Sequence, residues 1–318
     1  MVKIFDCSNS EKRPLHRGGR GPLVNDIMRY LQENCSNYNC EFVKSIDDAD
    51  VAITNDVFPN HVLASNKPLV KRMDGVFWHS NLVDRNYLLN EAAQQADKVI
   101  FISEYSRESY FRIYGDPLQS HCVVKHWVDP KVFNRTQPAL NKKLVLVASA
   151  TDWDRPEKRL QCHLRFASLF KDSVHIILIG KIHPIYSVPS NVTKVGYLEK
   201  PEHMADVLHT ADGFLNLTYR DAATKTVPQA ISCGLPVLYS CSGGVPEMVY
   251  DCGVGIPELN DFNIINVIPS LSNTQLEKGY DNLMINWHSL VEKVNKFDPT
   301  IKFKEMLDNY FSAIQSVI

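Results

Sequence analysis

The 318-residue sequence lacks the patterns that mark several common classes of protein. Its 8 cysteines include no C-x-x-C pair and its 11 histidines include no H-E-x-x-H motif, so the spacing indicates neither a zinc site nor a metalloprotease. A formal net charge of -2, with both signs mixed along the chain, offers no strongly basic surface to nucleic acid. We therefore expect reduced thiols, no bound metal and no nucleic-acid partner.

Long apolar runs are missing too, since no stretch is long and apolar enough to span a bilayer. The chain opens on residues 2–5, which are typical of a first strand and not of a signal peptide. We expect a cytoplasmic protein with no transmembrane segment, and a peripheral contact with a membrane stays open. A chain of 318 residues is long enough for two domains of similar size, each with its own core.

Short apolar segments alternate with amphipathic stretches, which favours α/β domains with doubly wound parallel sheets. Residues 134–141 contain Pro138 and few apolar side chains, so they are the best candidate for a linker. The expected strands cover residues 2–5, 40–43, 51–53, 69–72, 98–103 and 122–125 before the linker, and 142–148, 174–179, 192–195, 213–217 and 235–239 after it. A Gly-rich turn follows the first strand, but its glycines do not form the G-x-G-x-x-G fingerprint of dehydrogenases.

The most informative stretch covers residues 219–249. It contains a polar loop with Asp221, a short helix closed by a glycine, a buried strand, and a second Gly-rich turn before a helix at Glu247. Two helix N-termini should then lie at one place, where free N–H groups favour a phosphate. Asp221, Gln229 and Glu247 could bind the hydroxyl groups of a sugar or a ribose there. An ordinary pair of strand-to-helix turns would produce a similar pattern.

The same stretch resembles the donor site of retaining glycosyltransferases of the GT-B fold, in particular those of glycosyltransferase family 4. That family has two acidic residues separated by seven positions, the second of which opens E-A-x-A-x-G-x-P-V, and then a G-G-x-x-E turn. Here Asp221 stands at the first position and Gln229 at the second, within Q-A-I-S-C-G-L-P-V and before G-G-V-P-E. The glutamine removes a charge but keeps an acceptor and adds donors, so it can still bind ribose hydroxyls, while the rate of turnover is put in question.

The resemblance covers most of the chain and is strongest from Leu144 to Ile256. It implies two Rossmann-like domains that face a central cleft, with an acceptor-side domain at residues 1–138, a nucleotide-sugar donor domain at residues 139–300, and a helix at residues 301–318 that crosses back. It also implies transfer of a hexose from a nucleoside-diphosphate sugar to a hydroxyl group of a glycan, a lipid or a protein-linked sugar. UDP- and GDP-sugars are expected in preference to ADP-sugars, with a saccharide as the acceptor.

Members of that family bind the donor diphosphate through a lysine and an arginine on the loop that corresponds to residues 149–160. Lys158 matches the lysine, and Arg155 or Arg159 would be its partner, although the usual spacing between the two is not kept. The alternative is that these basic residues are exposed to solvent at the start of the following helix and bind nothing. Cations are unfavourable at the positive end of a helix dipole, however, unless an anion is present. The resemblance implies further donor contacts from Gly18, Gly19, Tyr197, Leu198, Thr224, Lys225, Thr226, Val227, Gln229 and Glu247.

The acceptor side is indicated by an R-x-D-G segment, which some bacterial members of the family carry at this place. Arg72, Asp74 and Gly75 match it, and Asp74 would accept a hydrogen bond from a sugar hydroxyl. A tight turn is an equally good interpretation of Asp74 and Gly75. The sequence departs from the family at His126 and Trp127, which stand where N-G is usual.

The implied reaction needs no cofactor or metal. Lys158, its arginine and the backbone of residues 224–227 would stabilise the negative charge that grows on the leaving β-phosphate, while Asp221 holds the sugar. No carboxylate is clearly placed as a nucleophile, so attack on the same face of the sugar, assisted by the leaving phosphate, is favoured over a double displacement. Two alternatives stay open. One is a nucleotide-sugar epimerase of the same fold, and the other is a non-catalytic sugar-nucleotide-binding or scaffold subunit, which the glutamine at position 229 would suit.

Overall fold

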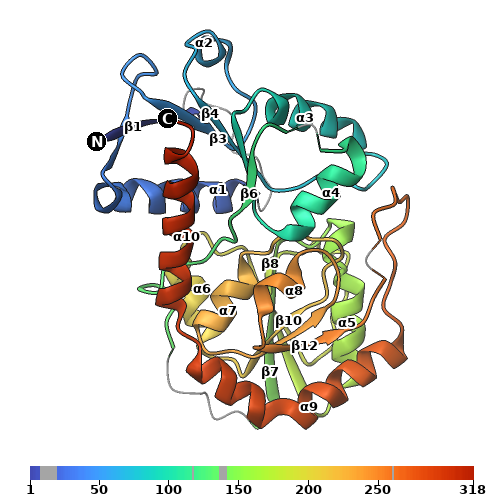
Figure 1. Cartoon of the computed structure of the whole chain (residues 1–318). Helices are drawn as coiled ribbons and strands as arrows, with labels where there is room; N and C mark the ends of the chain where they lie inside the picture. The colour runs from blue at the N-terminus through green and yellow to red at the C-terminus, as the bar shows by residue number, and fades with distance from the viewer. Residues whose placement is uncertain (8–19, 117, 136–141, 260) are drawn as a thin grey trace. The chain divides into compact units, whose positions relative to one another are not determined.

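The computed structural model describes residues 1–7, 20–116, 118–135, 142–259 and 261–318. The chain divides into two compact units (Figure 1). Unit 1 comprises Met1–His126, Phe262–Asn266 and Phe303–Ile318, and unit 2 comprises Trp127–Asp261 and Val267–Lys302. Glycines 18 and 19 lie outside the described residues, so their predicted donor contact stays a prediction.

The six strands of unit 1 form one parallel sheet, in the order β2-β1-β3-β4-β5-β6. Their apolar side chains are buried on both faces, as is typical of a parallel sheet that helices cover on both sides. The order reverses between β1 and β3, and in such sheets ligands bind beyond the carboxyl ends of the strands at that point. The strands are β1 (Val2–Asp6), β2 (Cys40–Val43), β3 (Val51–Thr54), β4 (Leu69–Met73), β5 (Lys98–Phe101) and β6 (His121–Val123).

The helices of unit 1 include the last helix of the chain, α10 (Pro299–Gln315), whose residues from Phe303 onward belong to this unit. Phe311 of α10 stacks on Tyr38 with ring centroids 4.2 Å apart, and the Tyr38 hydroxyl donates to Asp308 at 2.7 Å. The other helical segments are α1 (Arg20–Asn34), the 3₁₀ turn η2 (Cys35–Tyr38), α2 (Asn60–Leu63), η3 (Val83–Arg85), α3 (Asn86–Gln94) and α4 (Glu104–Tyr114).

A short excursion of the chain, residues 262–266, also belongs to unit 1 although the residues on both sides of it belong to unit 2. Ile265 forms an isolated parallel bridge with His79. The ring of Phe262 lies 5.7 Å from that of Trp78 and 5.5 Å from that of Tyr105. Unit 1 is therefore assembled from three separate segments of the chain.

The six strands of unit 2 also form one parallel sheet, in the order β12-β11-β10-β7-β8-β9. Numbered within the unit, this order is that of a Rossmann sheet, and its reversal lies between β7 and β10. The strands are β7 (Leu144–Asp152), β8 (Val174–Lys181), β9 (Val192–Val195), β10 (Gly213–Asn216), β11 (Val237–Ser240) and β12 (Gly253–Ile256).

The longest helix, α9 (Asn273–Lys296), packs against the edge of the unit 2 sheet at β12. It begins with a capping box, in which the Ser272 side chain accepts from the Gln275 backbone N–H and the Gln275 side chain accepts from the Ser272 backbone N–H. Gly279 allows a close approach, because a Cβ there would lie 2.6 Å from Ile256. The other helical segments are η4 (Pro156–Lys158), α5 (Leu160–Leu169), α6 (Pro201–Leu208), α7 (Thr226–Ser232) and α8 (Val245–Val249).

The boundary between the units precedes the expected linker. The sequence places it at residue 138, whereas residues from Trp127 onward group with unit 2. The reason is a set of contacts that sequence patterns do not reveal. Trp127 packs against Tyr250 and Phe297 with ring centroids 5.8 and 5.2 Å away, and Arg135 donates to the Asn295 carbonyl at 2.6 Å.

The expected fold class is confirmed, because both units are α/β with parallel, doubly wound six-strand sheets. None of the helices in the described ranges is long and apolar enough to cross a bilayer.

Candidate functional site

The loops that follow β7 and β10 meet where the strand order of unit 2 reverses. The first loop starts at Trp153, whose backbone N–H donates to the Lys181 carbonyl at 2.9 Å and whose ring N–H donates to the Ile179 carbonyl at 3.0 Å. The chain then turns through η4 and ends at Lys158, just before α5. The second loop carries Asp221. Strands β7 and β10 are neighbours, and the strand order runs away from them in opposite directions. The loops after these two strands therefore place a lysine and an aspartate at the same edge of the sheet.

Lys158 and Asp221 form an ion pair, with 2.6 Å between Nζ and Oδ2. The two side chains are 15% and 18% exposed, so the pair is shielded from solvent but reachable. An ammonium group has three donors, and the contact with Asp221 uses one of them. The structure gives the other two donors no partner among the residues that it describes, so a ligand can use them.

Backbone contacts hold Asp221 in place from two directions. The Tyr219 N–H donates to the Glu157 carbonyl at 2.8 Å, which joins the two loops. The Gly244 N–H donates to the Asp221 carbonyl at 2.8 Å. Gly243 has a φ of 71°, and a Cβ at that position would lie 2.3 Å from the Asp221 carbonyl oxygen. The Gly-rich turn is thus packed directly on the backbone of the aspartate, which only glycine permits.

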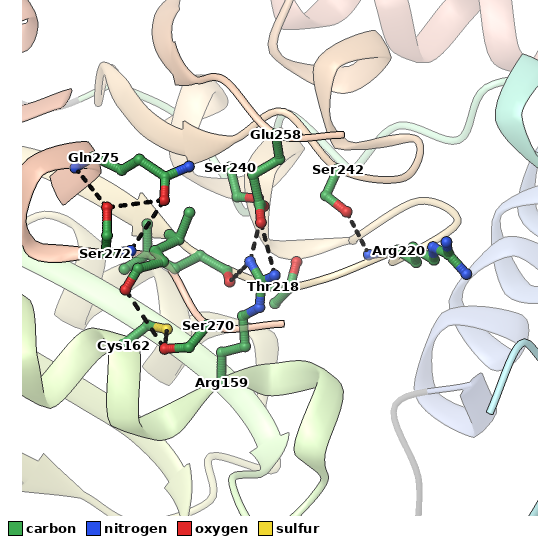
Figure 2. A network of polar contacts seen from close by, with 12 residues as sticks. Arg159, Cys162, Thr218, Arg220, Ser240, Ser242, Glu258, Ser270, Ser272 and Gln275 are labelled. Carbon is green, nitrogen blue, oxygen red and sulfur yellow. Dashed lines mark hydrogen bonds and ion pairs between the residues drawn. The ribbon is translucent and has the colours of Figure 1, made fainter. Parts of the chain in front are cut away.

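Arg159 does not face the same way as Lys158. Its buried guanidinium donates to both carboxylate oxygens of Glu258, at 2.8 and 2.7 Å, and the Ser240 hydroxyl donates to the same carboxylate (Figure 2). Such a bidentate pair neutralises the arginine inside the protein. The predicted contact between Arg159 and a diphosphate would require this buried pair to open.

The other two arginines of these loops also have carboxylate partners. Arg155 is 42% exposed and pairs with Glu157 on its own loop. Arg220, next to Asp221, is buried and pairs with Asp261. Its backbone N–H donates to the Ser242 hydroxyl at 2.9 Å (Figure 2). The three arginines of these loops are therefore each paired with a carboxylate, and the partner of Lys158 is itself a predicted sugar ligand.

The buried side chain of His163 forms hydrogen bonds with both loops. Its Nδ1 donates to the Arg159 carbonyl at 3.0 Å, and its Nε2 accepts from the Leu217 backbone N–H at 3.3 Å. A carbonyl can only accept, so the arrangement fixes the proton on Nδ1 of a neutral ring. Burial, with the nearby charge of Arg159, lowers the pKa of His163 to about 4, although hydrogen bonds to the Arg159 and Leu215 backbones act in the opposite direction.

The segment from Thr224 to Gln229 forms the start of α7. The Thr224 and Thr226 hydroxyls lie 2.9 Å apart, Lys225 is the N-cap residue, and Val227 is fully buried, so only its backbone could reach a ligand. Gln229 is 3% exposed, and its Oε1 has no hydrogen-bond partner within the described part of the chain. A buried acceptor without a partner is costly, and it is a position where a ligand hydroxyl would be stabilising.

The remaining predicted donor residues lie on other loops of the same sheet edge. Glu247 is in the first turn of α8, where its backbone N–H donates to the Gly244 carbonyl at 3.2 Å. Tyr197 and Leu198 follow β9, and the Tyr197 ring is solvent-exposed with Lys181 Nζ 5.9 Å from its centroid. The preceding residue, Gly196, accepts a backbone hydrogen bond from Gly180 at the end of β8.

Asp74 belongs to unit 1, at the carboxyl end of β4. Its carboxylate accepts from Nη1 of the buried Arg72 at 2.5 Å. Of the three predicted catalytic residues, the structure thus brings Lys158 and Asp221 together in unit 2 and places Asp74 in a separate network. No cluster of three or more potential metal-ligating side chains occurs among the residues that the structure describes.

Several residues that shape the site were not predicted from the sequence. Glu258 is 99 positions away from the arginine that it neutralises, and no motif marks it. His163 carries no ligand spacing, although a histidine five positions after the key lysine is a polar residue on the buried face of α5. Ser242 stands just before the recognised Gly-Gly pair, so the turn itself was the only available signal.

The comparisons with known proteins show the fold. No protein family matches the sequence, and no curated protein matches it. Among solved structures, HepE from Anabaena in complex with UDP-glucose matches with a TM-score of 0.66 and 14% identity, covering 98% of this chain and 100% of that chain. WaaG, a glycosyltransferase involved in lipopolysaccharide biosynthesis, matches with a TM-score of 0.64 and 13% identity over 98% and 99%. A glycosyltransferase from Rickettsia africae matches with a TM-score of 0.62 and 13% identity over 96% and 84%. The chain therefore has the two-domain GT-B fold.

Proposed function

We propose that this protein is a retaining glycosyltransferase of family 4 type, which transfers a hexose from a nucleoside-diphosphate sugar to a hydroxyl acceptor. The observation that carries the proposal is the Lys158–Asp221 pair at the strand-order reversal of unit 2. A cation for a diphosphate and a carboxylate for sugar hydroxyls lie side by side there. HepE was solved with UDP and with UDP-glucose, which makes UDP-glucose the first donor to test.

The proposed reaction breaks the bond between the anomeric carbon and the β-phosphate oxygen, and the electron pair stays on that oxygen. The two remaining donors of Lys158 and the backbone N–H groups of residues 224–227 would stabilise the growing negative charge. The acceptor hydroxyl attacks the same face of the sugar and gives its proton to the departing phosphate oxygen. This scheme needs neither a protein nucleophile nor a metal.

The other residues are proposed to hold the donor. Asp221 would accept hydrogen bonds from sugar hydroxyls through the part of its carboxylate that is exposed to solvent. Gln229 would receive a ribose hydroxyl at its buried Oε1, and Tyr197 with Leu198 would contact the base. Because Arg159 is held by Glu258, we propose that Lys158 is the main side-chain cation, with the exposed Arg155 as its partner.

The test is the binding of UDP and UDP-glucose to the protein and to the Lys158→Ala variant, measured by calorimetry. A charge-assisted hydrogen bond contributes about 1.5–3 kcal/mol, so the variant should bind UDP roughly ten- to a hundredfold more weakly. Lys143→Ala is the matched control, because Lys143 lies just before β7, at the opposite end of that strand, and donates to the Lys171 carbonyl at 3.0 Å. Equal affinity in the three proteins would remove Lys158 from the site.

Product analysis then separates the transferase from its alternatives. A transferase given UDP-glucose and a saccharide acceptor yields UDP and a new glycoside in which the anomeric configuration of the donor is kept. An epimerase yields an isomerised sugar without any acceptor, and a binding subunit raises the melting temperature with UDP-glucose but releases no UDP. Parallel melting curves with GDP- and ADP-sugars test the expected preference for UDP or GDP.

A further inference from the structure

A buried polar network surrounds Arg72 in unit 1. The side chain of Arg72 is completely buried, and its Nε donates to the Tyr310 hydroxyl at 2.9 Å. Its Nη1 donates to the Asn55 side-chain carbonyl at 3.1 Å and to Asp74 at 2.5 Å. Its Nη2 has no hydrogen-bond partner within the described ranges. The guanidinium is therefore oriented by three side chains, one of which comes from the last helix of the chain.

The charge balance of this network depends on Asp74. Burial acts against the charge of Arg72, but Asp74 and Tyr310 outweigh it, and the pKa of Arg72 lies above its ordinary value. Asp74 is the carboxylate in this set, and its side chain is 17% exposed. It is thus the member of the network that a ligand can reach, while the residues that orient it are buried.

Tyr310 is fully buried in α10, and burial raises the pKa of its hydroxyl. The helix is held on unit 1 by other contacts as well. Phe311 stacks on Tyr38, Phe303 packs edge-on against Tyr30 at 5.1 Å, and the Gln315 side chain donates to the Tyr38 carbonyl at 2.9 Å. Loss of the Tyr310 hydroxyl alone would therefore leave the helix in place and release only the Nε side of the guanidinium.

We propose that Tyr310 is a positioning residue, which acts through Arg72 to hold the Asp74 carboxylate in the orientation that accepts a hydrogen bond from the acceptor hydroxyl. This inference rests on the proposed function. A guanidinium is planar, so fixing its Nε also fixes the direction of Nη1, to which Asp74 is bonded. The Asp74 carboxylate is then oriented, through Arg72, by a residue that lies 236 positions further along the sequence.

The matched pair of variants is Tyr310→Phe and Tyr38→Phe. Both remove a hydroxyl and keep the aromatic ring; Tyr310 lies on α10, and Tyr38 packs against it. The Tyr38 hydroxyl bonds to Asp308 and not to Arg72, so it reports the general effect of loosening the helix. Asp74→Asn removes the carboxylate, so its kcat shows how much activity is lost when Asp74 no longer accepts the hydrogen bond.

The rate test uses UDP-glucose with water as the acceptor, and UDP release is followed. We expect Tyr310→Phe to lower kcat about tenfold and Asp74→Asn to lower it further, while the Kd for UDP stays unchanged because the donor site is in unit 2. Tyr38→Phe should keep the rate. If Tyr310→Phe and Tyr38→Phe have the same kcat, or if Tyr310→Phe changes the Kd for UDP as much as kcat, the proposal is overturned.

A second measurement does not depend on turnover, and it separates this proposal from the proposed function. With ¹³C-labelled aspartate, the Asp74 carboxyl resonance should move in Tyr310→Phe and not in Tyr38→Phe, because only the first change is transmitted through Arg72. An unmoved Asp74 resonance in Tyr310→Phe refutes the positioning role even if the enzyme is active. A moved resonance in a protein that neither binds nor turns over sugar nucleotides supports the network and refutes the function.

Discussion

The neutral, buried state of His163 leads to a prediction about stability in acid. The ordinary pKa of histidine is 6.5, and the folded protein holds that of His163 at about 4, chiefly through burial. Between these values the unfolded chain binds a proton that the folded protein does not accept. The contribution of the neutral His163 ring to the free energy of unfolding is therefore complete above pH 6.5, and it is lost as the pH falls toward 4. At roughly 1.4 kcal/mol for each pH unit, the loss amounts to about 3 kcal/mol.

The structural reason is the pair of contacts made by the ring. Protonation would place a hydrogen on Nε2, where the Leu217 N–H already points, while Nδ1 is committed to the Arg159 carbonyl. The charged ring would also lie beside the Arg159 guanidinium in a buried position. Since these contacts join the loops of Lys158 and Asp221, acid should loosen the candidate donor site together with the fold.

The assay is urea denaturation between pH 7 and pH 4.5, followed by tryptophan fluorescence, for the natural protein and His163→Gln. The glutamine cannot titrate, so the gap in unfolding free energy between the two proteins should narrow as the pH falls. His175→Gln is the control, since His175 lies on β8 and contacts the Thr193 hydroxyl at 2.9 Å. Parallel pH profiles for the natural protein and His163→Gln would refute the reasoning, because some other group would then carry the acid sensitivity.

Two further substitutions test the geometry of the donor loops. Gly243→Ala places a Cβ 2.3 Å from the Asp221 carbonyl oxygen in a left-handed conformation, so we expect a Kd for UDP at least tenfold higher in calorimetry; unaltered affinity would show that the turn does not position Asp221. Glu258→Gln leaves the buried Arg159 without its charged partner, and denaturation should show a loss of about 3–5 kcal/mol. A loss below about 1 kcal/mol would mean that water reaches the arginine.

Most regular elements could be predicted because their signals are local. The amphipathic pattern of residues 276–294 predicts a helix, and α9 runs from Asn273 to Lys296, since the capping box lies just before that pattern. Strand β11 was expected to begin at Leu235 but begins at Val237. The reason is Pro236, which has no N–H to donate and contributes only its carbonyl, to the Phe214 N–H at 2.9 Å.

The candidate site was predictable only in part, and the limit is physical. The family motif marks Lys158 and Asp221, and both lie in loops that follow neighbouring strands of a doubly wound sheet. The motif and the sheet topology together were therefore sufficient to predict that the two residues lie close to each other. The ion pair of Arg159 could not be predicted, because its partner is a carboxylate 99 positions further along the chain that no motif marks. A sequence shows that a cation is present, whereas only packing shows whether a ligand or the protein itself neutralises it.

The division of unit 1 into three segments has a consequence for the order in which the protein matures during translation. The first 126 residues leave the ribosome without the helix that later covers Arg72, and residues 303–318 follow only after the residues of unit 2. At about 5–20 residues per second, the wait from residue 126 to residue 318 is on the order of 10–40 s. Unit 1 is thus begun first and completed last, and until residues 303–318 are made the Arg72 guanidinium lacks the Tyr310 hydroxyl that orients its Nε.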